Sequence, residues 1–305
     1  MKSRTITDSD AKERLDIYAI AQQPLLSRAF IQKLIVESKI KVNNKAQKPS
    51  YKLKINDRVS IDFDMKELEL IPNIELPVIY EDKDCIVIDK PVGLLAHSKG
   101  VFNPEATVAT WLQKRIHADD HVNQHNQRMG IVHRLDRGTS GVMIVAKNSQ
   151  ALAWLQKQFA ARKVKKTYMA VVDGKLHLNE AIIDMPIERN PKSPKSFRVG
   201  VNGKPSKTEY KVIKVASLPG KGKVHNDQIM SLIELKPETG RTHQLRVHLK
   251  QIGHPIVGDP VYGGKPFERM LLHANSLELT LPNHERHVFR ASIPIVFETY
   301  MKAQL

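Results

Sequence analysis

Residues 130–147 read GIVHRLDRGTSGVMIVAK and form the most informative stretch of the chain. An apolar segment that ends at Leu135 leads into a turn rich in glycine, threonine and serine over 137–141, and a second apolar run follows it. This order predicts a buried strand that begins directly after a tight turn, with Asp136 at the junction between the apolar segment and the turn.

The surroundings of Asp136 suit a carboxylate with a chemical task. Arg134 and Arg137 lie on either side of it in the sequence, and neighbouring positive charge favours the ionised form of a carboxyl group. The structural alternative is an aspartate that caps the turn through its own backbone hydrogen bonds, a common role for this residue type. The isolated segment leaves both interpretations open.

A second informative segment, residues 235–259, reads LKPETGRTHQLRVHLKQIGHPIVGD. Its apolar residues recur every three to four positions, which predicts an amphipathic helix over 242–252 that ends at the following glycine and proline. Arg246 lies beside the apolar stripe of this helix. A partly buried arginine needs an acidic partner, for which Asp136 is a candidate, and a solvated basic helix face is the alternative.

The larger part of the chain, from Pro77 onward, alternates short apolar runs with helical patterns. This alternation predicts an α/β (α+β) domain with a mixed, mostly antiparallel sheet. The sequence contains neither a GxGxxG fingerprint nor a P-loop, so the usual nucleotide-cofactor sites are not expected. Helices are predicted over 106–116, 150–162 and 242–252, and strands over 141–147, 168–172, 210–214 and 230–235.

The first sixty residues have a different character. They predict two short helices, over 11–20 and 27–38, followed by a turn and a strand. Nine Lys or Arg and only two acids lie in residues 28–58, whereas residues 62–75 contain five acids and one lysine. The second stretch is typical of a linker that faces solvent, and the first indicates a basic surface.

The composition restricts the partners of the protein. Its 305 residues include 48 Lys+Arg and 32 Asp+Glu, a net charge of +16, which favours a polyanion such as nucleic acid or an anionic lipid surface. The single cysteine, Cys85, lies in an apolar run and is expected in the core. No apolar run approaches the ~20 residues of a membrane helix and the start is polar, so a soluble cytoplasmic protein is expected.

Two motifs near the N-terminus, RLDIYA at 14–19 and SRAFIQKLIVESKIKVNNK at 27–45, resemble the S4-type RNA-binding domain. The resemblance implies an RNA-binding domain over 12–64, with RNA contacts from Arg28, Lys33 and Lys39. Clustering of basic residues on one helix and the turn after it favours this interpretation. The alternative is a generic pair of amphipathic helices with solvated lysines.

The remaining motifs resemble the RluA/RluD family of pseudouridine synthases, in the family's own order. The resemblance implies a catalytic domain of the pseudouridine synthase fold over 77–305, behind a linker over 65–76, and the subtype with the most similar motifs modifies large-subunit ribosomal RNA. The motifs are HRLD at 133–136, TSG at 139–141, KKTY at 165–168, GRTHQLRVH at 240–248 and GDPVYGG at 258–264.

Taken residue by residue, the resemblance implies that Asp136 is the catalytic aspartate and Arg246 its ionic partner. It also implies that Tyr168 packs on the target uracil and that Arg134 fills the space left by the flipped base. Without the resemblance, Tyr168 would be interpreted as a core tyrosine of a strand. Isomerisation needs no redox step, so no cofactor and no metal are expected. Asp136 can serve as nucleophile or as base, and the sequence does not choose.

The target bond inside folded RNA becomes accessible when the nucleotide is extruded, which costs a few kcal/mol. Residues 192–223, with nine Lys or Arg and one acid, are suited to the phosphate contacts that offset this cost. A solvated loop is the alternative. The residues expected to contact phosphate there are Lys192, Lys195, Arg198 and Lys204.

Several histidines of the sequence have structural interpretations. His117, His121 and His125 have helical spacing, but their Asn/Gln-rich surroundings favour a surface loop over a metal site. His133 is expected to be a structural hydrogen-bonding residue. The alternative functions are a non-catalytic RNA-binding or ribosome-assembly factor, a synthase acting on transfer RNA, and a basic membrane-surface protein. We expect a monomer whose partner is RNA, with no membrane and no small-molecule cofactor.

Overall fold

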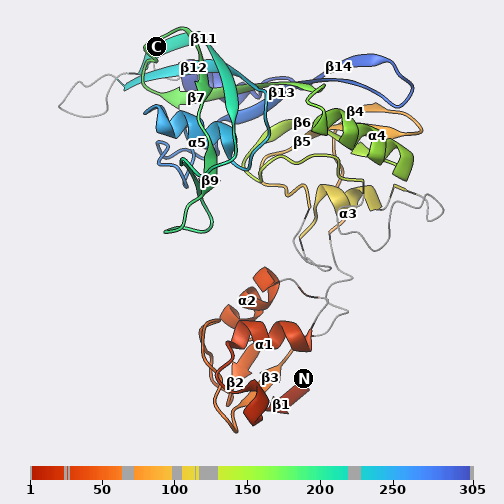
Figure 1. The fold of residues 1–305 in the computed structure, drawn as a ribbon, viewed down its shortest axis with the longest axis vertical. Helices are drawn as coiled ribbons and strands as arrows, with labels where there is room; N and C mark the ends of the chain where they lie inside the picture. The colour runs from red at the N-terminus through yellow and green to blue at the C-terminus, as the bar shows by residue number, and fades with distance from the viewer. Residues whose placement is uncertain are drawn as a thin grey trace. The chain divides into compact units, whose positions relative to one another are not determined.

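The computed structural model describes residues 2–23, 26, 28–63, 72–97, 105–113, 115–116, 130–218 and 228–302. The chain divides into two compact units (Figure 1). The first contains Met1–Glu75 and His97–Arg115, and the second contains Leu76–Ala96 and Gly130–Leu305.

The first unit is a small module of helices and a three-stranded antiparallel sheet. Its elements are β1 (Lys2–Thr5), the 3-10 helix η1 (Asp8–Asp10), α1 (Leu15–Gln22), α2 (Arg28–Val36), β2 (Ile40–Val42) and β3 (Arg58–Ile61), and α3 (Val108–Gln113) also belongs to it. The sheet has the order β1-β3-β2. Tyr18 of α1, Ile31 of α2 and Val59 of β3 are buried in one core, because each element presents a single apolar face.

Helix α1 begins four residues after the predicted start of 11. Lys12 has a φ of +70° and Arg14 has extended backbone that bridges to Lys52, so neither residue can continue a right-handed helix. The helix therefore starts at Leu15. The second helix, α2, lies within the predicted range 27–38.

The second unit is built on a nine-stranded sheet. Its strands are β4 (Val78–Glu81), β5 (Cys85–Lys90), β6 (Ser140–Ala146), β7 (Lys165–Asp173), β8 (Glu180–Asp184), β11 (Lys207–Leu218), β12 (Gln228–Pro237), β13 (Leu272–Thr280) and β14 (Arg286–Arg290). The order is β4-β5-β6-β13-β7-β12-β11-β8, and β14 pairs with β13. Among the strands that the structure describes, only β6 and β13 pair in parallel. The predicted mixed, mostly antiparallel sheet is thus confirmed.

Three helices cover this sheet: α4 (Ser149–Ala160), α5 (Gln244–Gln251) and α6 (Ile295–Lys302). Leu249 of α5 packs in one core with Ala170 of β7, whereas Phe297 of α6 packs with Met169. Successive residues of a strand point to opposite faces, so α5 and α6 cover opposite faces of the sheet around β7. The helices predicted over 150–162 and 242–252 overlap α4 and α5, and the helix predicted over 106–116 overlaps α3 of the first unit. Cys85 is buried as expected.

A two-stranded antiparallel hairpin, β9 (Ile187–Arg189) with β10 (Phe197–Val199), lies outside the large sheet. It projects beyond α5 in Figure 1. Apolar side chains of both strands pack on Val247 of α5 and on Tyr262. We call residues 187–204 the hairpin, because Ile187 also bridges to Lys204.

Some predictions fall outside the described residues. These are the metal-like histidines His117, His121 and His125, part of the predicted linker at 65–71, and residues 219–223 of the second basic stretch. Among the helices in the described ranges, none is long and apolar enough to cross a membrane.

Candidate active site

A cavity of about 520 Å³ opens in the second unit between β7, the start of α5 and the loop before β6. The four residues to which the sequence assigned site roles, Arg134, Asp136, Tyr168 and Arg246, all line it. They come from three segments that are distant in sequence. The fold therefore gathers the predicted site residues around one space of ligand size, since ligand sites are about 300–1,000 Å³.

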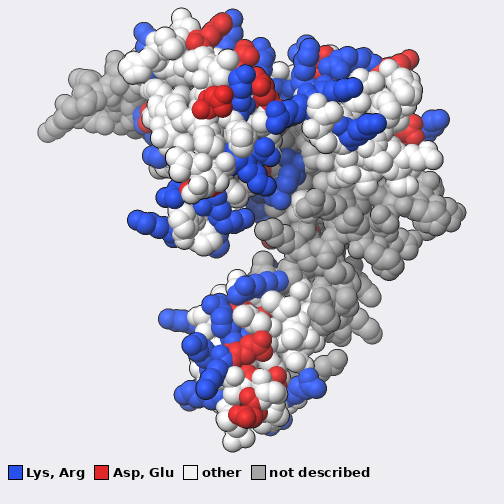
Figure 2. All heavy atoms as spheres, in the orientation of Figure 1, with Lys and Arg blue, Asp and Glu red and all other residues white. Residues whose placement is uncertain are grey.

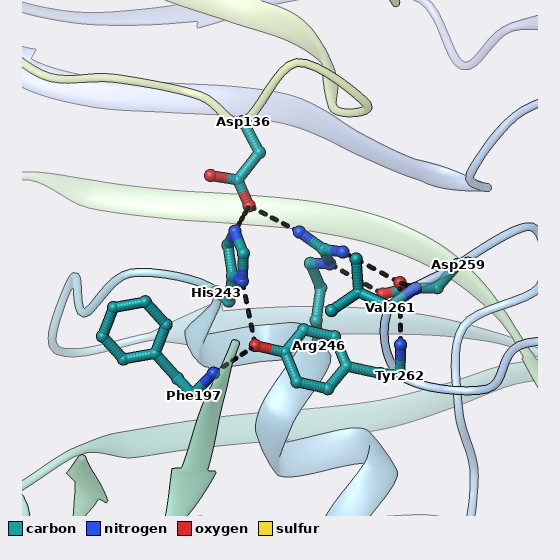
Figure 3. A network of polar contacts seen from close by, with 7 residues as sticks. All are labelled: Asp136, Phe197, His243, Arg246, Asp259, Val261 and Tyr262. Atoms are coloured by element: carbon teal, nitrogen blue, oxygen red, sulfur yellow. Dashed lines mark hydrogen bonds and ion pairs between the residues drawn. The ribbon is translucent and has the colours of Figure 1, made fainter. Parts of the chain in front are cut away.

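Asp136 and Arg246 face each other in this cavity. The Nη1 of Arg246 lies 3.3 Å from the Oδ2 of Asp136, and the side chain of Arg246 is 8% exposed against 20% for Asp136 (Figure 3). In the part of the chain that the structure describes, the second carboxylate oxygen of Asp136, Oδ1, accepts no hydrogen bond. Asp136 thus presents one free oxygen in a partly desolvated position.

Asp259, which the sequence patterns did not single out, is the closer partner of Arg246. The Nε and Nη2 of Arg246 donate to Oδ2 and Oδ1 of Asp259 at 2.7 and 2.8 Å, and the backbone N–H groups of Val261 and Tyr262 donate to the same carboxylate. Burial opposes ionisation of Asp259, but these donors hold its pKa below the usual range. The sequence did contain a signal that could have identified Asp259. A buried arginine favours a carboxylate that it can bind through two hydrogen bonds, and Asp259 lies in the nearby GDPVYGG motif.

The turn that carries Asp259 depends on two glycines. Gly258 has a φ of +76°, and a Cβ there would lie 1.9 Å from the carbonyl oxygen of Arg269. A Cβ on Gly264 would lie 1.8 Å from the carbonyl oxygen of Ile256. No other residue type fits either position without moving the backbone. The GDPVYGG motif therefore forms a tight turn that holds Asp259 against Arg246.

His243 approaches the same oxygen of Asp136 as Arg246 does. Its Nε2 lies 3.7 Å from Oδ2 of Asp136, and its Nδ1 lies 2.9 Å from the hydroxyl of Tyr262, which accepts the backbone N–H of Phe197 at 2.9 Å (Figure 3). Burial lowers the pKa of His243, an effect that Asp136 opposes and Arg246 reinforces. The φ of His243 is +57°, which ends the helical conformation and makes α5 begin at Gln244 instead of the predicted 242.

Tyr168 and Lys166 project from the same face of β7, two residues apart, and both line the cavity. Burial and the charge of Asp136 raise the pKa of the Tyr168 phenol, which is therefore neutral. The Nζ of Lys166 lies 3.5 Å from the carbonyl oxygen of Thr239, and burial lowers the pKa of this lysine to about 8. Lys166 is a cavity cation that the sequence patterns did not single out.

Arg134 and His133 of the HRLD motif have different surroundings. Arg134 is exposed where it lines the cavity. His133 accepts the backbone N–H of Ile144 at 3.2 Å, and its ring stacks on Phe159 with 4.6 Å between centroids. Burial lowers the pKa of His133 to about 3, so the ring is neutral. His133 is thus a structural hydrogen-bonding residue, as the sequence predicted.

The predicted RNA-binding residues of the second unit lie on the hairpin and do not line the cavity. Lys192, Lys195, Arg198 and Lys204 are all exposed, and Figure 2 shows basic side chains over this projection. Arg198 is paired with Glu188 at 2.7 Å. The hairpin therefore offers an exposed basic surface with three lysines for which the structure shows no ion pair among the described residues.

In the first unit, a buried carboxylate on α1 binds side chains from the residue before α1 and from α2. Asp16 is fully buried and accepts hydrogen bonds from Arg14 at 2.9 Å, Arg28 at 3.0 Å and Gln32 at 2.7 Å. Burial opposes ionisation of Asp16, but these donors lower its pKa to about 2. Arg28 remains half exposed. Figure 2 shows basic side chains on one flank of the first unit.

The two lysines predicted to bind RNA in this unit differ in their surroundings. The Nζ of Lys33 lies 3.8 Å from Glu37 one turn further along the helix, and its side chain is exposed. Lys39 is half-buried, with its Nζ 5.9 Å from the ring centre of Phe63. The stem of Lys39 is thus held in place while Lys33 extends into solvent.

Comparison with known proteins is consistent along the chain. Residues 84–251 match the RNA pseudouridylate synthase family, and residues 13–59 match the S4 domain. An uncharacterized RNA pseudouridine synthase of Aquifex aeolicus is 39% identical over 83% of this chain and 78% of its own length. The ribosomal large subunit pseudouridine synthase D of Borreliella burgdorferi is 34% identical over 98% of this chain and 91% of its own.

Solved structures agree with these matches. Human RNA pseudouridylate synthase domain containing 1 aligns with a TM-score of 0.58 and 29% identity, covering 73% of this chain and 86% of that protein. The synthase match spans 84–251, which includes Asp136, Tyr168 and Arg246. The chain therefore belongs to the RNA pseudouridylate synthase family and is an isomerase that converts uridine in RNA to pseudouridine.

Proposed function

We propose that this pseudouridine synthase modifies specific uridines of large-subunit ribosomal RNA and that Asp136 carries the chemistry. The substrate proposal is supported by relatives named ribosomal large subunit pseudouridine synthase D, which match over most of the chain. The observation that carries the site proposal is the free Oδ1 of Asp136, which faces the cavity beside a buried guanidinium.

The proposed role of Asp136 is to start cleavage of the bond between ribose C1′ and uracil N1. As a nucleophile it forms an ester with C1′ and uracil leaves as an anion; as a base it removes the C2′ proton and the same bond breaks by elimination. Uracil then rotates and its C5 bonds to C1′. In the nucleophilic route this bond displaces the Asp136 carboxylate from C1′, and in the elimination route C2′ regains the proton that Asp136 removed. Loss of the C5 proton then completes the isomerisation. Either route uses the carboxylate form of Asp136, whose Oδ2 lies 3.3 Å from Nη1 of Arg246.

Tyr168 and Arg134 are proposed to act on the bases. The Tyr168 ring lies on the cavity wall with a neutral phenol, so it offers an amphipathic face on which uracil can stack. Arg134, exposed where it lines the cavity, is proposed to occupy the space that the flipped nucleotide leaves in the RNA. Its guanidinium suits that task because it is planar and stacks on aromatic faces.

Phosphate contacts are proposed to supply the energy for extrusion of the nucleotide. In the first unit they come from Arg28, Lys33 and Lys39, and in the second from the lysines of the hairpin. The S4 domain match at 13–59 supports RNA binding by the first unit. Such contacts give affinity and position the RNA without reading its sequence.

The proposed organisation has an RNA-binding domain over 12–64, a linker over 65–76 and a catalytic domain over 77–305. The S4 and synthase matches, at 13–59 and 84–251, each lie inside one of these ranges. We propose that the protein acts as a monomer, since one chain contains the proposed RNA-binding residues and the four proposed site residues that line the cavity. We also propose that it acts in the cytoplasm.

The role of Asp136 is tested by tritium release from RNA labelled at uridine C5. Asp136→Asn keeps the shape of the side chain and removes its charge, so release is expected to fall to background. Asp184→Asn, an exposed aspartate of the same unit, serves as the matched control and is expected to match wild type. Undiminished release by Asp136→Asn refutes the assignment of Asp136.

The substrate is tested by mapping pseudouridine in ribosomal and transfer RNA from cells with and without the protein. Loss of defined pseudouridines from large-subunit ribosomal RNA is expected. A loss confined to transfer RNA would overturn the substrate proposal and leave the chemistry intact. The non-catalytic assembly factor that the basic N-terminal module suggested is not favoured, because the synthase match covers the catalytic motifs.

A further inference from the structure

Two nitrogen atoms converge on one oxygen of Asp136. Arg246 Nη1 lies 3.3 Å and His243 Nε2 lies 3.7 Å from Oδ2 (Figure 3). The two side chains come from the same end of α5, one helical turn apart. Together they restrict rotation of the carboxylate about χ2 and leave Oδ1 directed away from both.

The protons of this arrangement can be assigned from its chemistry. The 3.7 Å between Nε2 of His243 and Asp136 is an electrostatic contact, longer than a hydrogen bond. Because a carboxylate oxygen only accepts, we assign the hydrogen of the neutral ring to Nε2. Nδ1 is then an acceptor, and the hydroxyl of Tyr262 donates to it at 2.9 Å. The same hydroxyl oxygen accepts the backbone N–H of Phe197 at 2.9 Å. A continuous chain of polar contacts thus runs from Phe197 to Asp136.

The far end of this chain belongs to the hairpin. Phe197 is the first residue of β10, and its ring packs edge-to-face on His243 with 5.6 Å between centroids. The guanidinium of Arg246 also lies over the ring of Tyr262, 4.9 Å from its centre. The hairpin, which carries the exposed Lys192 and Lys195, therefore packs against Tyr262 and His243, the two residues that connect it to Asp136.

We propose that His243 is a positioning residue and that the Tyr262–His243 pair couples the hairpin to Asp136. When the lysines of the hairpin engage the RNA backbone, Phe197 is held against Tyr262, and Asp136 is held with Oδ1 toward the flipped nucleotide. When RNA binds away from the hairpin, only Arg246, which is anchored on Asp259, restrains the carboxylate with full strength. The inference rests on the proposed catalytic role of Asp136 and adds a means by which substrate engagement prepares the site.

The first test removes one atom. Tyr262→Phe keeps the ring on Arg246 and deletes the hydroxyl that joins Phe197 to His243. In the tritium-release assay the kcat is expected to fall about tenfold while the KM for RNA stays within about twofold, because RNA contacts are unchanged. Tyr300→Phe is the matched control: Tyr300 lies on α6, and the structure shows no hydrogen bond of its hydroxyl to the described residues. It is expected to match wild type.

The second test measures the coupling itself. In the wild-type background, replacing Lys192 and Lys195 by alanine is expected to raise KM and to lower kcat. In the Tyr262→Phe background the same double replacement is expected to raise KM equally but to leave kcat unchanged, because the link is already broken. If the kcat factors of the two changes simply multiply, the coupling does not exist.

The third test asks whether His243 acts through its polar atoms. His243→Gln and His243→Ala occupy the same left-handed backbone position, but only glutamine retains a donor toward Asp136. The glutamine variant is expected to recover several-fold more kcat than the alanine variant at equal KM. Equal kcat values would contradict the positioning role.

These outcomes separate the inference from the proposed function. If wild type releases no tritium, or if Asp136→Asn releases it undiminished, the proposed function fails. If wild type is active, Asp136→Asn is inactive and Tyr262→Phe equals wild type, the proposed function stands and only the coupling is refuted.

Discussion

Arg246 and Asp259 form a buried bidentate ion pair directly behind the cavity, with N–O distances of 2.7 and 2.8 Å. The side chain of Asp259 is fully buried and that of Arg246 is 8% exposed. In a buried ion pair, the attraction between the charges offsets the free-energy cost of their desolvation only when the geometry is good. Because Asp259 occupies two donors of the guanidinium, the remaining Nη1 is directed at Asp136.

Removing the charge of Asp259 is expected to destabilise the protein. Asp259→Asn leaves the Arg246 guanidinium buried without its carboxylate, and breaking such a pair costs about 3–5 kcal/mol. The free energy of unfolding of the second unit in urea is the measurement. Glu298→Gln removes an exposed helix pair with Lys302 and is expected to cost less than about 1 kcal/mol. Similar losses for both variants would contradict the buried-anchor role.

Lys166 is expected to lower stability at neutral pH. Its pKa is about 8 in the folded protein against 10.5 ordinarily, because burial disfavours the ammonium. Between these values the unfolded chain binds more protons, so stability rises with pH there. Lys166→Met is therefore expected to be more stable than wild type at pH 7, by up to about 3 kcal/mol, with the difference shrinking from pH 8 to 10.5.

Urea unfolding at several pH values measures this difference. The exposed neighbour Lys165 points to the other face of β7, so Lys165→Met is the control. Its stability difference from wild type is expected not to change between pH 8 and 10.5. A stability difference between Lys166→Met and wild type that does not change with pH would contradict the burial argument.

Asp16 is expected to stabilise the first unit except in acid. Its pKa is lowered to about 2 from 3.8, since its three hydrogen-bond donors outweigh burial. A depressed carboxyl pKa contributes stability that is present above pH 4 and is lost as the pH falls toward 2. Asp16→Asn is expected to cost about 2 kcal/mol at pH 7. Amide hydrogen exchange in α1 and α2 reports the opening of this unit.

The exposed aspartate Asp8 provides the control for Asp16. Asp8→Asn is expected to leave exchange in α1 and α2 unchanged. Unchanged exchange for Asp16→Asn as well would show that the buried carboxylate contributes nothing to this unit.

The hairpin lysines are expected to contribute to RNA affinity through counterion release. Replacing Lys192, Lys195 and Lys204 by alanine removes three exposed cations, so the slope of log affinity against log salt is expected to become shallower by about one per lysine. RNA binding titrated at several salt concentrations gives this slope. The exposed Lys302 of α6 is the control, and Lys302→Ala is expected to leave the slope unchanged.

Local patterns were reliable where a single segment decides the outcome. The apolar periodicity of 242–252 and the alternation in the strands located α5 and the sheet, since helices and strands have fixed repeats. Boundaries shifted where one residue took a left-handed conformation, as at Lys12 and His243. Non-glycine residues adopt this conformation only rarely, and the surrounding structure decides where they do, so the identity of Lys12 or His243 does not predict it.

The sequence by itself determined the family, the sheet architecture and the four residues around the cavity, because their motifs are contiguous and each retains its residue types. The sequence also paired Arg246 with Asp136. Only the tertiary structure decided that Arg246 is anchored on Asp259 and that His243, joined through Tyr262 to the hairpin, approaches the same carboxylate. The physical reason is that a buried guanidinium or imidazole bonds to whichever polar group loses its water beside it. Packing of distant segments, and not their spacing in the chain, selects that group.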